Sequence, residues 1–316
     1  LGSRRHINLP GVRLNLPAMT EKDCADAVLA AELQLDFIAL SFVRDVAHVE
    51  EVRAFFAARS HVPRIVSKIE DQEAVHNIRA LIQASDVIMI ARGDLGIEVH
   101  LEELPIIQRR IVKQCHIMGR SVIVATHMLE SMVSNPSPTR AEVTDVANAV
   151  YEQADAIMLS GETSTGRYPL ECVDTLNRIA LRIEASGGAG FAELAVLSDE
   201  KQLTCRSAVV LANSLEKAVM VVFTKRGVMP RHLARLRPDA PIFAFSRDAR
   251  ICRGFALDRG INSIRFDFSA DSEETINNAA TYLRAKGFVT SGDRMVVVSD
   301  LFQQEGIVDS ILLKRV

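Results

Sequence analysis

The sequence predicts an α/β protein made of a partial TIM (β/α)8 barrel followed by a separate α/β domain. Short apolar runs alternate with helical patterns through the first half of the chain, which indicates parallel strands covered by helices. Polar side chains gather directly after those runs, where a TIM barrel keeps its chemistry. A doubly wound sheet would concentrate such residues at one switch point instead. A glycine-rich linker at 186–190 (SGGAG) ends the first pattern.

The first part is expected to contain five strands and five helices. The apolar runs at 37–40, 65–66, 87–90, 122–124 and 156–159 are typical of buried strands. Helical patterns occupy 21–32, 47–58, 77–83, 101–118 and 140–153. Thr20 is placed to cap the first of these helices. Thr139, with Glu142 three residues later, predicts a capping box at the start of the last one.

Beyond the linker the pattern restarts, and a second domain of about 125 residues is a usual size. Strands are expected at 219–224, 242–246, 263–267, 295–299 and 311–316. Helices are expected at 203–216, 230–236, 248–258 and 272–286. The ends of these strands carry few paired acids, so we expect the catalytic chemistry in the first part.

Charge, hydrophobicity and cysteine usage exclude several classes of protein. The 316 residues include 37 basic and 40 acidic side chains, a net charge of −3, which argues against a nucleic-acid-binding surface. The apolar runs stay far below the roughly 18 residues that span a membrane. The five cysteines are scattered without a CxxC pair, which indicates free thiols in a reducing, cytoplasmic setting.

One lysine and two carboxylates stand at the ends of predicted neighbouring strands. Lys68 and Glu70 are two residues apart, so they point to the same face of the sheet. Asp94 follows the next strand along the chain. Oxygen ligands favour Mg²⁺ or Mn²⁺ over zinc, and the eight histidines show no HxH or HxxxH spacing. The group predicts a divalent metal that holds an anionic, phosphorylated substrate; a structural ion pair is the alternative.

Further polar groups follow the predicted strands. Gly93 opens a turn whose N–H groups can hold a carboxylate or phosphate, with a plain turn as the alternative. Thr126 and Ser160 place hydroxyls at the same edge, where they can bind substrate, relay a proton or simply cap a helix. His127 is more typical of a solvated or core histidine than of a catalytic base.

In the second domain, one loop carries the features of an anion site. Thr224, Lys225, Arg226 and Gly227 precede a helix with several arginines. The start of a helix attracts phosphate, so we expect any anionic effector to bind at this loop. The alternative is that the arginines form a solvated helix face.

Taken together, the motifs of the first part closely resemble the pyruvate kinase family. The matching stretches occur in the family's order along the chain: INLPG at 7–11, SKIE at 67–70, IMIARGDLG at 88–96, MLESM at 128–132, PTRAEV at 138–143 and MLSGET at 158–163. The second domain resembles the family's regulatory domain in layout and more loosely in sequence.

The resemblance implies transfer of a phosphoryl group from phosphoenolpyruvate to ADP, which gives pyruvate and ATP in glycolysis. Lys68 would stabilise charge on the transferring phosphoryl group and on the enolate oxygen. Glu70 and Asp94 would hold Mg²⁺ or Mn²⁺. Arg5 stands where the family has a basic residue near the nucleotide phosphates. A loose phosphoryl transition state needs cations and alignment more than covalent chemistry, which agrees with this set of residues.

The resemblance also assigns groups to the organic part of the substrate. Backbone groups of Gly93 and Asp94, together with the Thr126 hydroxyl, would receive the substrate carboxylate. Ser160 and Glu162 would lie near the water path that protonates the enolate. The family further implies K⁺ as a second cofactor and a homotetramer as the assembly.

Some positions depart from the family's pattern. Asp71 stands where an asparagine is frequent, His127 where glutamine is common and Thr165 where lysine is common. The effector loop of members activated by sugar bisphosphates runs Ser/Thr-Gly-Arg-Ser/Thr, whereas residues 226–229 read RGVM. We therefore expect a monophosphate effector or none.

A complete member of the family has a further N-terminal stretch with three barrel strands and most of a small lid domain. On this comparison, 1–14 is the end of the lid domain, 15–186 holds barrel strands 4–8, and 187–316 is the regulatory domain. The further stretch would carry the K⁺ ligands and a phosphate-binding arginine, so we expect the chain alone to be inactive. The rival interpretations are a Mg²⁺-dependent lyase that acts on a pyruvate enolate, and a non-catalytic pyruvate kinase-like partner.

Overall fold

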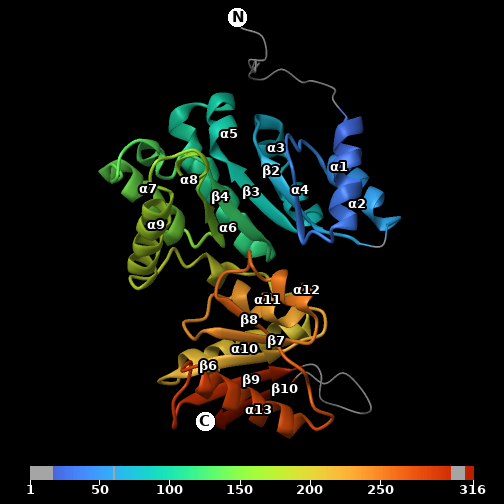
Figure 1. The fold of residues 1–316 in the computed structure, drawn as a ribbon, viewed down its shortest axis with the longest axis vertical. Coiled ribbons are helices and arrows are strands. Elements are labelled where there is room, and N and C mark those ends of the chain that lie inside the picture. The colour runs from blue at the N-terminus through green and yellow to red at the C-terminus, as the bar shows by residue number, and fades with distance from the viewer. Residues whose placement is uncertain (1–16, 60, 300–309) are drawn as a thin grey trace, which may run out of the picture. The chain divides into compact units, whose positions relative to one another are not determined.

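The computed structural model describes residues 17–59, 61–299 and 310–316. The chain forms two compact units, Leu1–Leu194 and Ala195–Val316 (Figure 1). The boundary expected after residue 186 falls between helix α9 (Pro169–Glu184) and the 3-10 turn η3 (Phe191–Leu194). The expectations about Arg5 and the segment 1–14 lie outside the described residues.

The first unit contains a five-stranded sheet in which all strands are parallel. The strands follow one another across the sheet in sequence order. They are β1 (Phe37–Leu40), β2 (Arg64–Ile69), β3 (Val87–Ala91), β4 (Ser121–Ala125) and β5 (Ala156–Met158). All five predicted strands are confirmed. Strand β2 is longer than the apolar run at 65–66, since it starts at Arg64 and continues through Ser67 and Lys68 to Ile69.

Helices follow every strand of this sheet, as the alternating pattern predicts (Figure 1). In chain order they are α1 (Glu21–Glu32), α2 (Val46–Ala57), α3 (Gln72–His76), α4 (Ile78–Ala84), α5 (Arg92–Glu98), α6 (Leu104–Met118), α7 (Arg140–Tyr151), α8 (Gly161–Ser164) and α9. Thr20 caps α1, and Thr139 forms the predicted capping box with Glu142 at the start of α7. Helix α9 was not among the predicted helices, although Pro169 at its first turn is a start signal.

The helices of the first unit pack on one face of the sheet. Strand residues such as Ile65, Ile88 and Val122 share a core cluster with helix residues such as Phe56 and Ile111. Because neighbouring side chains of a strand point to opposite faces, the intervening residues face away from the helices. Lys68 is one of these residues, as are Val66, Met89 and Ile123. A parallel sheet with helices on one face and polar groups at its carboxyl edge is a partial TIM barrel.

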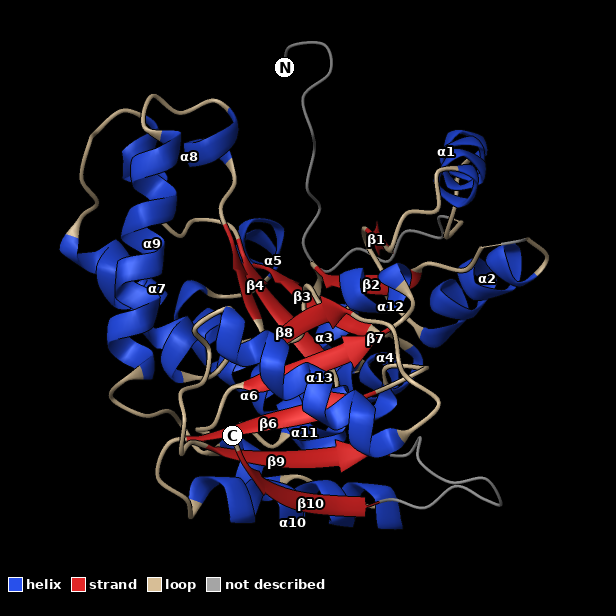
Figure 2. Ribbon diagram, turned by 60° about the horizontal axis from the view of Figure 1, so that its bottom comes forward, coloured by secondary structure: helices blue, strands red, loops and turns tan. Residues whose placement is uncertain are grey.

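The second unit is a separate three-layer α/β domain. Its sheet has the order β10-β9-β6-β7-β8, with β10 antiparallel to β9 and the other pairs parallel (Figure 2). The strands are β6 (Ala218–Phe223), β7 (Ile242–Ser246), β8 (Ile261–Arg265), β9 (Arg294–Ser299) and β10 (Ser310–Arg315). The helices are α10 (Glu200–Asn213), α11 (Val228–Arg235), α12 (Ala249–Arg253) and α13 (Ser272–Ala285).

Two core clusters cover the two faces of this second sheet. Residues of α10 and α11 pack with Met220 and Val222 on one face, and residues of α13 pack with Val221 and Phe223 on the other. The helix predicted at 248–258 is shorter than expected, since α12 ends before Gly254 and Phe255 turns into the first of these clusters. No helix within the described ranges is long and apolar enough to cross a membrane.

Candidate active site

The residues expected to carry chemistry gather at one edge of the first sheet, where its parallel strands end. The register pairs Lys68 of β2 with Met89 of β3. Glu70 and Asp94 each leave their strand at the carboxyl edge, and Thr126 follows β4 at the same edge. The shared edge agrees with the sequence prediction that these groups lie together.

Lys68 and Glu70 form an ion pair. The Lys68 Nζ lies 2.6 Å from Glu70 Oε1 and donates to Ser41 Oγ at 2.8 Å. The backbone N–H of Phe42 donates to Glu70 Oε2 at 2.5 Å. The Glu70 side chain is 1% exposed and that of Lys68 is 24% exposed. Burying a carboxylate is costly unless it is paired and hydrogen-bonded, so these contacts offset the burial of Glu70 and hold Lys68 at the rim.

Asp94 provides a second carboxylate that is open to a ligand. It is exposed, and it makes no hydrogen bond or ion pair with any described residue. No cluster of three or more His, Cys, Asp and Glu side chains suited to a metal occurs within the described ranges. Mg²⁺ is commonly bound through one or two carboxylates together with waters and substrate phosphates. The donor set of Glu70 and Asp94 fits such an ion.

Gly93 and Thr126 are brought together across neighbouring strands. The N–H of Gly93 donates to Thr126 Oγ1 at 2.7 Å, and that hydroxyl donates to the Ala125 carbonyl at 2.7 Å. Thr126 and His127 have φ angles of 67° and 54°, a left-handed conformation that is strained for residues other than glycine. Such strain clusters at functional sites and persists where surrounding contacts over-determine it.

Arg92 supplies those contacts, a role that its place after a predicted strand did not reveal. Its guanidinium is nearly buried and donates to the Thr126 carbonyl from Nη2 at 2.6 Å and from Nε at 3.2 Å. It is held in turn by Asp145 at 2.6 Å and by Gln108 at 3.3 Å. The available signal was an arginine directly after the wholly buried strand β3.

Ser160 and Glu162 follow β5 at the same edge. The Ser160 hydroxyl oxygen is buried and has no hydrogen-bond partner among the described residues. Glu162 is fully buried, and its carboxylate accepts the backbone N–H of Ser160 at 2.8 Å and that of Leu129 at 3.1 Å. An unpartnered buried hydroxyl costs about 1–3 kcal/mol, so Ser160 is a position where a bound water or ligand atom would recover stability.

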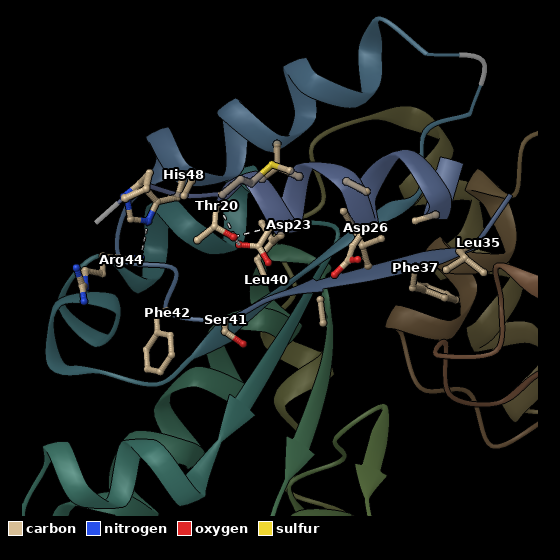
Figure 3. A pocket seen from close by; sticks show the side chains of 18 residues that line it. Thr20, Asp23, Asp26, Leu35, Phe37, Leu40, Ser41, Phe42, Arg44 and His48 are labelled. Atoms are coloured by element: carbon tan, nitrogen blue, oxygen red, sulfur yellow. Dashed lines mark hydrogen bonds between the residues drawn. The ribbon is translucent and has the colours of Figure 1, made fainter. Parts of the chain in front are cut away.

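A cavity of about 630 Å³ lies beside β1, between α1 and α2 (Figure 3). Ser41 and Phe42 line it and also contact the Lys68–Glu70 pair, so the cavity reaches the carboxyl edge of the sheet. Within the described ranges, β1 pairs only with β2, which leaves its other edge without a strand.

Asp71, one of the departures from the family's pattern, has a structural role. Its carboxylate caps α3 by accepting the Ala74 N–H at 2.8 Å, and it forms an ion pair with Arg44 at 3.1 Å. These contacts join the loops that follow β1 and β2. The aspartate therefore supplies a hydrogen-bond acceptor beside the rim, and its charge is paired with Arg44.

The expected effector loop lies at the carboxyl end of β6 in the second unit. Lys225 and Arg226 are exposed, and Gly227 starts α11 in a left-handed conformation with φ of 76°. The N–H of Gly227 donates to the buried Thr224 hydroxyl at 2.9 Å. Arg231 of α11 is held by Asp258 at 3.0 Å, so it is part of the packing of this domain. The two exposed cations are thus the groups that an anion would meet.

Known proteins match both units of the chain. The family model for the pyruvate kinase barrel domain matches residues 1–173, and that for the pyruvate kinase alpha/beta domain matches residues 202–312. A chloroplastic pyruvate kinase isozyme G of Ricinus communis is 41% identical over 301 residues, which cover 94% of this chain and 72% of the relative.

Two other relatives extend the comparison to a second plant and to a bacterium. Plastidial pyruvate kinase 2 of Arabidopsis thaliana is 40% identical over 304 residues, and the pyruvate kinase of Geobacillus stearothermophilus is 40% identical over 309 residues. The chain spans 52% of the length of each of these two relatives. Both matched domains and all of these relatives point to one family: the chain belongs to the pyruvate kinase family.

Proposed function

We propose that the protein containing this chain transfers a phosphoryl group from phosphoenolpyruvate to ADP, giving pyruvate and ATP. The observation that supports this most is the gathering of the Lys68–Glu70 pair, Asp94 and the Gly93–Thr126 contact at one edge of the sheet. A cation, two metal-binding carboxylates and a carboxylate-binding corner are the groups that this reaction requires.

Lys68 is the group that counters negative charge as the phosphoryl group departs. Its ammonium is held by Glu70 and by Ser41, so it is oriented before the substrate arrives. Preorganised charge of this kind stabilises a transition state more than a mobile side chain does. A divalent ion bound by Glu70 and Asp94 would bring the phosphate oxygens together and neutralise part of their charge.

Gly93 and Thr126 form the corner for the substrate carboxylate. The Gly93 N–H donates to the Thr126 hydroxyl, which donates to the Ala125 carbonyl, so a carboxylate bound at this corner would replace these two bonds with bonds to itself. Ser160 supports the protonation of the enolate, since its buried hydroxyl lacks a partner among the described residues and can hold a water. Glu162 lies beside it.

The test is a coupled assay on the full-length protein, with phosphoenolpyruvate, ADP and Mg²⁺. Pyruvate and ATP should form in equal amounts, and Lys68→Met should remove most of the turnover. Pyruvate enolate chemistry without phosphoryl transfer to ADP would favour a lyase. A protein that binds a second pyruvate kinase subunit but shows no turnover would favour a non-catalytic partner.

The assembly, the second cofactor and the compartment belong to the same proposal. The family is usually oligomeric, and we propose a homotetramer that depends on K⁺. All five cysteines are free thiols, which supports a reducing compartment, and we propose the cytoplasm. Chloroplastic names among the relatives make organelle fractionation of the native protein the test of this location.

A further inference from the structure

The carboxylate of Glu162 bridges the loops that follow two neighbouring strands. One oxygen accepts the N–H of Leu129, in the loop after β4, and the other accepts the N–H of Ser160, directly after β5. We infer that Glu162 is a positioning residue that couples these two loops, and not the acid–base group that protonates the enolate. The inference rests on the proposed function for its kinetic part and on geometry alone for the rest.

Glu162 differs from Glu70, whose partner Lys68 is partly exposed at the rim, because among the described residues its carboxylate hydrogen-bonds to backbone N–H groups alone. The side chain is fully buried, and each carboxylate oxygen has a backbone donor. Charge-assisted bonds of this kind are about twice as strong as neutral ones. Both oxygens are thus engaged by the backbone of the loops after β4 and β5.

The segment that carries Glu162 is itself packed tightly. A Cβ at Gly166 would lie 2.3 Å from the Glu162 carbonyl oxygen, so only glycine fits at this turn. The N–H of Arg167 donates to the Val133 carbonyl at 3.0 Å, which ties the end of α8 to the loop after β4. The Glu162 side chain therefore starts from a backbone that has little freedom to move.

Glu162 is one of three charged residues that hold the loop after β4. Arg92 binds the carbonyl of Thr126 at the start of this loop, and Glu142 of α7 binds the N–H of Ser131 at 2.7 Å. Glu162 acts between them, at Leu129. The loop that begins at the strained Thr126 is thus held by three different elements, and loss of one anchor should loosen the loop at the contact that is lost.

We assign the contact with substrate or water to the Ser160 hydroxyl, and Glu162 acts by holding the Ser160 backbone. The N–H of Ser160 is bound to Glu162, whereas its hydroxyl has no partner within the described ranges. The backbone of Ser160 has φ of −128° and ψ of −110°, an uncommon combination that the Glu162 contact holds in place. Loss of Glu162 should therefore displace the Ser160 hydroxyl. It should not remove a group that gives or takes a proton in the reaction.

The experiment uses Glu162→Gln and Glu162→Asp in the full-length protein, with Asp155→Asn as a matched control. Asp155 binds the N–H of Val122 at 2.9 Å, so it joins β4 and β5 at their amino ends as Glu162 does at their carboxyl ends. The measurements are amide hydrogen exchange of peptides that contain Leu129 and Ser160, the KM for phosphoenolpyruvate, and the pH profile of kcat.

We expect both Glu162 variants to speed exchange at Leu129 and Ser160 by about tenfold, because at least one charge-assisted bond is lost or weakened. The KM should rise, and the pH profile of kcat should keep its shape. Asp155→Asn should speed exchange at Val122 only. The aspartate variant keeps an acid but is too short to reach both amides, so it decides the matter even if the glutamine variant fails to fold.

Two results would overturn the inference. One is that both amides exchange in Glu162→Gln at the wild-type rate. The other is that Glu162→Gln loses one limb of the pH profile of kcat while Glu162→Asp keeps it. If the wild-type protein shows no turnover with phosphoenolpyruvate and ADP, the proposed function fails. Exchange at Leu129 and Ser160 still tests the bridging role in that case.

Discussion

The Glu142 carboxylate accepts both the backbone N–H of Ser131, at 2.7 Å, and its hydroxyl, at 2.6 Å. The same carboxylate closes the capping box of α7 with Thr139. One side chain therefore caps a helix and fastens the loop that leads from Thr126 into it.

This arrangement predicts a dependence of stability on pH. Burial raises the pKa of Glu142, but the hydrogen bonds from Ser131 and Thr139 outweigh it and lower that pKa below the ordinary 4.5. A lowered folded-state pKa means that the stabilisation is present above pH 4.5 and is lost as the pH falls through the folded value. Glu142→Gln should cost about 1 kcal/mol in the free energy of unfolding at neutral pH.

The check is chemical denaturation of both proteins between neutral pH and pH 3. The difference between wild type and Glu142→Gln should narrow below pH 4.5. Glu130→Gln is the control, since Glu130 is an exposed carboxylate in the same loop and should change stability by less than about 0.5 kcal/mol. If the difference in unfolding free energy between wild type and Glu142→Gln stays constant with pH, the charge of the carboxylate does not contribute to holding the loop.

The second prediction separates the roles of Lys68 and Glu70. Glu70→Gln removes the charged partner of Lys68 and an oxygen proposed to bind the metal, so the affinity for Mg²⁺ and the turnover should fall together. Lys68→Met should lower kcat by about 100-fold or more while Mg²⁺ binding changes much less, because its charge matters most in the transition state. Titration with Mn²⁺ and steady-state kinetics measure the two effects. Equal losses of metal affinity in both variants would contradict the assignment.

A third prediction probes the carboxylate corner with a single methyl group. A Cβ at Gly93 would lie 3.4 Å from Thr126 Oγ1, an ordinary contact that the fold can accept. The methyl would occupy the corner where the substrate carboxylate is proposed to bind. Gly93→Ala should therefore raise the KM for phosphoenolpyruvate by about tenfold, with little change in melting temperature.

Gly96→Ala is the matched control for that measurement. Its added Cβ would meet only Leu104, at 3.5 Å, on the side of α6. This variant should keep the wild-type KM. A Gly93→Ala protein that binds phosphoenolpyruvate as well as wild type would place the substrate carboxylate elsewhere.

The fourth prediction concerns the effector loop. Lys225 and Arg226 are exposed beside the start of α11, so Lys225→Ala with Arg226→Ala should weaken any binding of a sugar monophosphate by about tenfold or more. Calorimetric titration of the full-length protein with a sugar monophosphate and with fructose 1,6-bisphosphate distinguishes the effectors. Tight bisphosphate binding that survives both substitutions would contradict the placement of the site and the expected class of effector.

The fifth prediction concerns the 316-residue polypeptide expressed by itself. In the described part of the chain, β1 and β5 each pair on one side only, and α9 exposes Leu170, Val173 and Leu181. Unpaired strand edges and uncovered apolar side chains favour association. We expect this polypeptide to associate on a sizing column and to lack turnover in the coupled assay. A monomer that melts cooperatively and turns over phosphoenolpyruvate would contradict the expectation.

Local signals were enough to predict much of the fold. The caps at Thr20 and Thr139 depend on residues within one turn, and each strand of the first sheet is built around a short apolar run. The burial of Arg92 was not predictable in this way, because Asp145 and Gln108 reach it from distant helices. The different roles of Ser160 and Glu162 were not predictable either, because they depend on the bond between Glu162 and the N–H of Leu129, in the loop after β4.

The order of strands in the two sheets has a consequence for how the chain assembles during synthesis. Each strand of the first sheet pairs with the one made just before it, so the sheet can grow as the polypeptide emerges. In the second sheet, β6 must wait for β9, which is made after β7, β8 and α13. Pairing over such a distance in sequence is slow. Until β9 has been synthesised, the backbone groups along one edge of β6 remain unpaired. The second domain is most prone to misassembly during this interval.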